Sequence, residues 1–163
     1  MRRLLALCLT LAVAGCAWLG GIGSEQVGSP VGSVAYVVDK SRGWGQGVYL
    51  PADVPGLVRR LRAELGAEEV ARSLEAAGPE VVAVALYFDA CAKGGPVLVR
   101  SGDRVAPRFT TSDNRNCYRA VDTLTVFAVP IRDLREGTTF ALCRYTATLA
   151  GGRLSESGER GLC

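Results

Sequence analysis

The stretch Val81-Val82-Ala83-Val84-Ala85-Leu86-Tyr87-Phe88 decides the fold, because eight successive residues carry no charge. Pro79-Glu80 precedes the stretch and Asp89 follows it, so its boundaries are clear. An apolar run of this length without polar alternation is typical of a strand that is buried on both faces. We therefore predict that residues 81–88 form a central strand of a sheet.

The residues before this strand predict helix. Asp53 occupies an N-cap position, and Pro55 falls in the first turn. Apolar side chains follow at helical spacing, namely Val54, Leu57, Val58, Leu61 and Leu65. Gly66 is the expected end of this helix. A second helical stretch covers residues 67–77, so either two short helices or one bent helix fits the pattern.

Short strand candidates surround this helical part. They cover residues 34–38, 48–50, 97–100, 104–109, 118–129 and 141–149. The pair 97–100 and 104–109 is a hairpin candidate, and residues 141–149 alternate as a half-exposed antiparallel strand does. The remaining residues, 151–163, read as a polar tail. We predict an α+β domain in which one or two helices lie between early and late strands of a largely antiparallel sheet, with a sandwich arrangement left open.

The start of the chain predicts export. Arg2 and Arg3 precede an apolar run over residues 4–14, which is too short to span a bilayer. The run closes on Val13-Ala14-Gly15-Cys16, which resembles the lipobox of bacterial lipoproteins. That resemblance implies cleavage before Cys16, a diacylglyceryl group on its sulfur, and an extracytoplasmic location on the cell membrane or the outer membrane. The alternative is an ordinary signal peptide that is cut at Ala14 or Ala17.

Length and composition predict one domain. Residues 1–15 are assigned to the lipoprotein signal peptide, and residues 16–33, rich in Gly and Ser, to a flexible tether. The 148 residues from Cys16 onward, 163 − 15, suit one core better than two. Residues 34–163 are therefore predicted to be a single disulfide-stapled domain.

The cysteines predict two disulfides. Of the six cysteines, Cys8 belongs to the signal and Cys16 to the lipid anchor. The even set that is left comprises Cys91, Cys117, Cys143 and Cys163. Export makes these residues competent for disulfides, and their spacing lacks the close pair of a zinc or redox motif. We expect Cys91–Cys117 to clamp a hairpin and Cys143–Cys163 to hold the tail.

The residues that could carry chemistry favour a protein without catalytic activity. The chain has no histidine, which excludes Ser-His-Asp and Cys-His catalysis and His-based metal sites. Carboxylates stand near predicted element ends, at Asp39, Asp53, Asp89 and Asp122, but no spacing singles out a pair. No metal, cofactor or nucleic-acid partner is predicted.

Two groups of residues are candidate binding sites. Trp44 lies between glycines and could stack on a sugar or peptide, although folding back onto the core is the commoner outcome. Five arginines on and after the predicted hairpin could form a basic face for anionic lipid or an anionic envelope polymer, namely Arg100, Arg104, Arg108, Arg115 and Arg119. Solvated strand faces explain the arginines equally well.

The order of features after the helices resembles that of uncharacterised exported proteins of high-GC bacteria, and this resemblance implies no activity. It comprises an apolar strand, a Cys, a Gly-rich turn, a second Cys and a strand ending in Ala-Val-Pro. We expect a membrane-anchored lipoprotein that binds an envelope partner without catalysis. The alternatives are an inhibitor that presents residues 110–116 to a secreted hydrolase, and a small glycan-acting enzyme.

Overall fold

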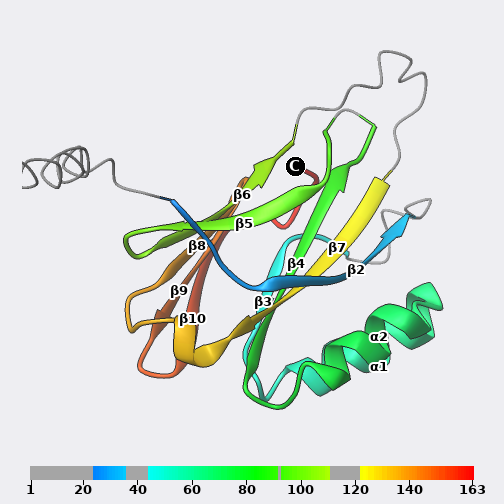
Figure 1. Cartoon of the computed structure of the whole chain (residues 1–163), viewed down its shortest axis with the longest axis horizontal. Helices are drawn as coiled ribbons and strands as arrows, with labels where there is room; N and C mark the ends of the chain where they lie inside the picture. The colour runs from blue at the N-terminus through cyan, green and yellow to red at the C-terminus, as the bar shows by residue number, and fades with distance from the viewer. Residues whose placement is uncertain (1–23, 36–43, 92, 111–121) are drawn as a thin grey trace, which may run out of the picture.

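The computed structural model describes residues 24–35, 44–91, 93–110 and 122–163. These residues form two stacked sheets, and two helices cover the outer face of one of them (Figure 1). The elements in chain order are β1 (Glu25–Gln26), β2 (Ser29–Ala35), β3 (Gly47–Tyr49), α1 (Val54–Leu65), α2 (Glu68–Ala76), β4 (Val81–Asp89), β5 (Pro96–Ser101), β6 (Arg104–Phe109), β7 (Asp122–Pro130), η2 (Ile131–Asp133), β8 (Thr139–Leu142), β9 (Tyr145–Ala150) and β10 (Arg153–Gly158).

The two sheets are largely antiparallel. The four-stranded sheet has the order β2-β7-β4-β3, and the six-stranded sheet has the order β1-β5-β6-β8-β9-β10. The pairing of β6 with β8 is parallel, whereas every other strand pair in the described residues is antiparallel. The predicted α+β class is therefore confirmed, and the sheets form a sandwich with a helical layer on one side.

Strand β4 is central because both of its faces are covered. Alternate side chains, Val82, Val84, Leu86 and Phe88, pack in the core between the two sheets. The intervening side chains, Val81, Ala83, Ala85 and Tyr87, pack against the helices. All eight are buried, which confirms the prediction for this stretch. A strand between two apolar layers has no solvent-exposed face, so polar residues do not alternate along its sequence.

The helical segment forms two helices rather than one bent helix. Helix α1 buries Leu57, Val58 and Leu61 against the four-stranded sheet, as their spacing predicts. Gly66 ends α1 in the left-handed conformation, at φ 61°, which glycine adopts without the Cβ clash of other residues. Asp53 precedes the helix but makes no side-chain cap hydrogen bond. None of the helices in the described residues is long and apolar enough to cross a membrane.

The predicted tether over residues 16–33 is wrong for its second half, because β1 and β2 lie there. Val27 is buried between the sheets, and its N–H donates to the Leu98 carbonyl at 3.0 Å. Gly28 then turns the chain from one sheet to the other at φ 67°, where a Cβ would lie 2.7 Å from a Val129 methyl carbon. Residues 16–23 lie outside the described part, as does Val13-Ala14-Gly15-Cys16.

The end of the chain also departs from the prediction. Residues 141–149 are two strands, β8 and β9, separated by a turn at Cys143 and Arg144. Cys143 adopts φ 59°, a left-handed conformation that non-glycine residues rarely take, so the pattern gave no sign of the turn. Residues 153–158 form β10 instead of a polar tail, because Gly151 and Gly152, both at positive φ, allow a tight hairpin.

One of the two predicted disulfides is confirmed. Cys143 and Cys163 are bonded, with their Cα atoms 5.5 Å apart. The bond ties the β8–β9 turn of one sheet to the other sheet, because the Cys163 N–H donates to the Tyr87 carbonyl in β4 at 3.0 Å. Cys91 is also disulfide-bonded. Its expected partner, Cys117, lies outside the described residues, so that pairing stays a prediction.

Candidate functional site

Trp44 is not an exposed stacking platform, so the binding role considered for it is wrong. Only 8% of its surface is exposed, and its ring belongs to the core on the helix side of the four-stranded sheet. The outcome is the commoner one that the sequence allowed, a tryptophan that closes the core. The Arg60 guanidinium lies 4.4 Å from the centre of this ring, so Trp44 makes a cation–π contact with a charged residue of α1.

The predicted basic face is divided between the two faces of a sheet. The hairpin β5–β6 is confirmed, but its register places Arg100 opposite Val105, on the buried side. Arg100 pairs there with Glu25 at 2.7 Å. Arg104 lies opposite Ser101, and successive residues in a strand point to opposite faces. Arg104 therefore lies on the face away from Arg100, as does Arg108, and both arginines are exposed. A two-residue turn thus separates arginines that the pattern had grouped, and Arg115 and Arg119 lie outside the described residues.

The candidate carboxylates show structural contacts. Asp89 and Asp122 are opposite one another on β4 and β7, and Asp89 accepts a hydrogen bond from the Cys91 N–H at 2.9 Å. This bond is a turn role of the kind expected for Asp89. Asp39 lies outside the described residues, as does most of the loop over residues 110–116. The part of the chain that the structure describes contains no group of three or more His, Cys, Asp or Glu that could hold a metal ion.

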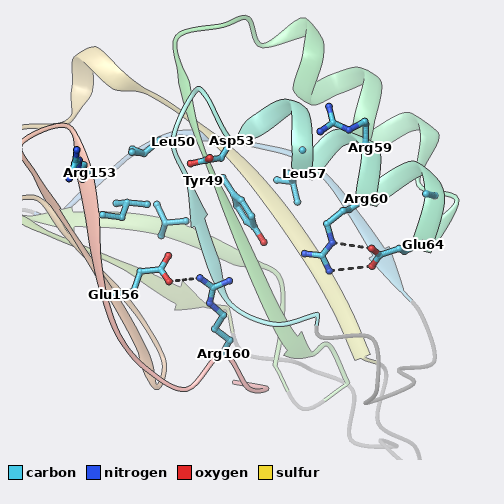
Figure 2. Close-up of a pocket in the computed structure, with 14 residues that line it drawn as sticks. Tyr49, Leu50, Asp53, Leu57, Arg59, Arg60, Glu64, Arg153, Glu156 and Arg160 are labelled. Carbon is cyan, nitrogen blue, oxygen red and sulfur yellow. Dashed lines mark hydrogen bonds and ion pairs between the residues drawn. The ribbon is translucent and has the colours of Figure 1, made fainter.

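A groove of about 790 Å³ lies where the edges of the two sheets meet α1 (Figure 2). Among the described strands, β3 is the last of one sheet and β10 is the last of the other, so neither sheet has a further described strand on this side. The apolar part of the lining includes Val48, Leu57 and Leu154. Charged side chains surround it, namely Arg59, Arg60, Arg153, Arg160, Asp53, Glu64 and Glu156. No local pattern in the sequence predicts this groove.

Two arginines flank Tyr49 inside the groove. Arg60 donates from Nε and Nη2 to the Glu64 carboxylate at 3.0 and 3.2 Å. Arg160 donates from Nη2 to Glu156, and its guanidinium lies 5.3 Å from the centre of the Tyr145 ring. Ring contact and ion pair together orient each guanidinium, so that the remaining nitrogen atoms face the Tyr49 hydroxyl from its two sides (Figure 2).

The electrostatics of this arrangement favour an anion. Burial raises the pKa of the Tyr49 hydroxyl, although Arg60 and Arg160 oppose the rise, so the hydroxyl is a hydrogen-bond donor at neutral pH. The hydrogen bond with Glu64 raises the pKa of Arg60, whereas the charge of Arg160 acts to lower it. The two guanidinium groups therefore repel one another across Tyr49. An anionic group between them would accept hydrogen bonds from both and relieve that repulsion.

The rim of the groove adds further positive charge. Arg59 and Arg153 are exposed, and neither forms an ion pair with another described residue. Four arginines thus face three carboxylates, and two of these carboxylates, Glu64 and Glu156, are already paired with arginines. The charges that remain free to meet a ligand are mainly positive.

Part of this site could have been found in the sequence. Arg60 and Glu64 stand at i and i+4 on a predicted helix, a spacing that favours an ion pair. A run of charged residues on a helix is usually a solvated face, so this spacing alone does not indicate a binding site. Tyr49 and Arg160 carried no local signal, because they approach Arg60 only when three distant segments fold together. Comparison of the chain with protein-family models, with known proteins and with solved structures gave no match.

Proposed function

We propose that this protein is a non-catalytic binding protein that holds an anionic group of its ligand in the groove between α1, β3 and β10. The observation that carries the proposal is the convergence of Arg60, Arg160 and the Tyr49 hydroxyl on one point. Planar guanidinium groups recognise carboxylate and phosphate through paired hydrogen bonds. The ligand is accordingly an envelope protein, an anionic envelope polymer or a lipid headgroup that carries such a group.

The chemistry of the lining supports binding rather than catalysis. General acid–base catalysis needs a side chain that exchanges a proton near neutral pH, and the chain has no histidine. Glu64 is engaged by Arg60. Burial acts to raise the pKa of Glu156, but its hydrogen bonds with Tyr145 and Arg160 lower that pKa overall, so this carboxylate stays ionised. Tyr49 keeps its proton because burial raises its pKa. The groove therefore offers fixed charges and donors, which suit recognition.

We further propose that the protein acts on the outer side of a bacterial membrane, anchored through lipid on Cys16. The support is the pattern Val13-Ala14-Gly15-Cys16 after a short apolar run. A single acyl chain binds membranes reversibly, whereas the several chains of a lipoprotein anchor hold a protein stably. The binding groove would then be presented to molecules of the envelope.

Replacing Arg60 or Arg160 with glutamine should weaken anion binding by about 10- to 100-fold, because a charge-assisted hydrogen bond is worth roughly 1.5–3 kcal/mol. The measurement is titration of the full chain with succinate and, separately, with inorganic phosphate, followed by the NMR shifts of the arginine side-chain N–H groups. Tyr49→Phe should weaken binding less, because it removes one uncharged donor.

Arg104→Gln is the matched control for these titrations. It removes the same charge from an exposed position on the opposite side of the six-stranded sheet. We expect it to leave both dissociation constants within about twofold of the unchanged protein. Equal weakening by Arg104→Gln and Arg60→Gln would show that overall charge, rather than the groove, attracts the anion.

Cys16→Ser should release the protein from membranes or leave it as an uncleaved precursor, because serine has no sulfur to receive the diacylglyceryl group. Fractionation of cells, followed by mass spectrometry of the N-terminal peptide, measures both outcomes. Cys8→Ser is the control, and it should leave acylation unchanged because Cys8 precedes the expected cleavage point. An acylated N-terminal peptide from the Cys16→Ser protein would contradict the lipobox assignment.

A further inference from the structure

We propose that the occupant of the groove is an extended acidic peptide segment, which adds to β10 as a further strand of the six-stranded sheet. The inference rests on the proposed function, since it takes the groove as the binding site. It goes further by naming the chemical class of the partner and the way in which its main chain is held.

Strand β10 lines the groove with an edge on which no main-chain partner is found among the described residues. In β9, the Leu149 N–H donates to Thr138 and the Leu149 carbonyl accepts from Gly137, so both groups point toward β8. Leu154 lies opposite Leu149, and its own N–H and carbonyl must therefore point away from β9. The main-chain groups of every second residue in a strand point to the same edge, so the N–H and carbonyl of Glu156 also point away from β9. Both residues line the groove, and β9 is the only strand neighbour of β10 in the described part of the chain.

The edge of β10 is shaped for pairing. Its six residues keep a continuous register with β9, without a bulge, and none of them is proline. Exposed strand edges of this kind add a strand from another chain, in which main-chain hydrogen bonds supply affinity and alternate side chains supply specificity. A lipid headgroup or a glycan lacks the alternating N–H and carbonyl groups that would match this edge.

The size and the charge of the groove fit an acidic peptide. A volume of about 790 Å³ exceeds what one carboxylate needs and falls in the range of sites for larger ligands. A strand beside β10 would turn alternate side chains toward Tyr49, where Arg60 and Arg160 meet a carboxylate. Arg59 and Arg153 at the rim would meet further acidic residues. The side chains facing the groove should therefore be Asp or Glu at every second position.

The test uses three probes with the full chain. The first is the capped hexapeptide Asp-Ser-Asp-Ser-Asp-Ser. The second is a pair of isomers in which either the Asp amides or the Ser amides are N-methylated. The third is succinate, which offers carboxylates without a main chain. In a strand, amides of alternate residues point to opposite edges, so one isomer loses the N–H groups that face β10 and the other keeps them.

We expect the parent peptide to bind at least about tenfold more tightly than succinate. One methylated isomer should lose at least about tenfold in affinity relative to the other. Amide hydrogen exchange provides a second readout, because the N–H groups of Leu154 and Glu156 should exchange at least tenfold more slowly with peptide bound. The N–H groups of Ser155 and Ser157 point toward β9 and should not change.

Three results would overturn the inference, and they separate it from the proposed function. If both isomers and the parent bind equally while Arg60→Gln abolishes binding, the anion site stands and strand addition is wrong. If succinate binds and the peptide does not, the anion site stands and the partner is not a peptide. If neither succinate nor the peptide binds, both proposals fail.

Discussion

Replacing Gln46 with leucine should lower the free energy of unfolding by roughly 3 kcal/mol, because its side-chain hydrogen bonds to three main-chain groups, each worth about 1 kcal/mol, are lost. Only 1% of the surface of Gln46 is exposed. Its Nε2 donates to the carbonyls of Tyr87 and Gly161 at 2.6 and 3.0 Å, and its Oε1 accepts from the Tyr87 N–H at 3.1 Å. The buried leucine offers none of these contacts.

The physical reason for this cost is that Gln46 extends a sheet with its side chain. Strand β3 begins at Gly47 and pairs with β4 as far as Ala85. The Gln46 amide then takes the place of a main-chain neighbour beside Tyr87 and also reaches the segment that ends at Cys163. A leucine of similar size keeps the volume but removes the donor and the acceptor, so the loss is mainly of polar contacts.

Chemical unfolding in urea, followed by tryptophan fluorescence, measures the difference. Gln26→Leu is the matched control, because it makes the same chemical change at an exposed residue of strand β1. Surface substitutions of this kind usually alter stability by less than about 0.5 kcal/mol. Equal losses in the two variants would contradict the structural role assigned to Gln46.

The parts of the fold that could be predicted from sequence are those with local causes. The apolar run of β4 is favourable only where both faces of the strand are buried. The spacing in α1 places Leu57 and Leu61 on one face of the helix, whatever they pack against. The hairpin β5–β6 follows from the glycine between its strands. Each of these elements is specified within a dozen residues, and local patterns report such elements well.

The missed parts of the fold depend on distant contacts. The turn at Cys143 is held by a disulfide to Cys163, and neither residue favours a left-handed conformation by itself. Val27 looks like one apolar residue in a polar, glycine-rich stretch until it enters the core between the sheets. The sequence around each residue contains no sign of these partners, so local patterns predicted a continuous strand and a tether.

The candidate site was missed for the same reason. Its three donors come from β3, α1 and the segment after β10, and they are separated by up to 111 positions in the chain. Arg100 and Arg104, two members of the predicted basic face, are four positions apart in the chain but lie on opposite faces of a sheet. A charge cluster in sequence is a surface cluster only when the register agrees, and the register is a property of the folded sheet.

Replacing Cys143 and Cys163 with serine should lower the free energy of unfolding by about 3 kcal/mol. The disulfide closes a loop with a sequence separation of 20 residues, and the chain-entropy model gives a loss of this size for such a loop. The same urea titration measures it, under conditions that preserve any other disulfide. A change below about 1 kcal/mol would mean that the hydrogen bonds of the last residues hold the segment by themselves.

The disulfide variant should also bind anions less tightly, because Arg160 lies in the segment that the bond secures. The Gln46 N–H donates to the Arg160 carbonyl at 3.3 Å, and the Glu159 N–H donates to the Arg144 carbonyl at 3.1 Å. These contacts place the guanidinium beside Tyr49, and a looser segment would spend more time away from that position. We expect the dissociation constant for succinate to rise by at least about threefold.

Combining the disulfide variant with Gln46→Leu tests whether the two features act on the same segment. Gln46 donates to Gly161, which precedes Cys163 by two residues, so its contact is worth less once the segment is released. The combined loss of stability should fall short of the sum of the separate losses by roughly 1 kcal/mol, within the range seen for residues in one network. Strict additivity would show that Gln46 stabilises β4 alone. The disulfide, and not Gln46, would then hold the segment that contains Arg160.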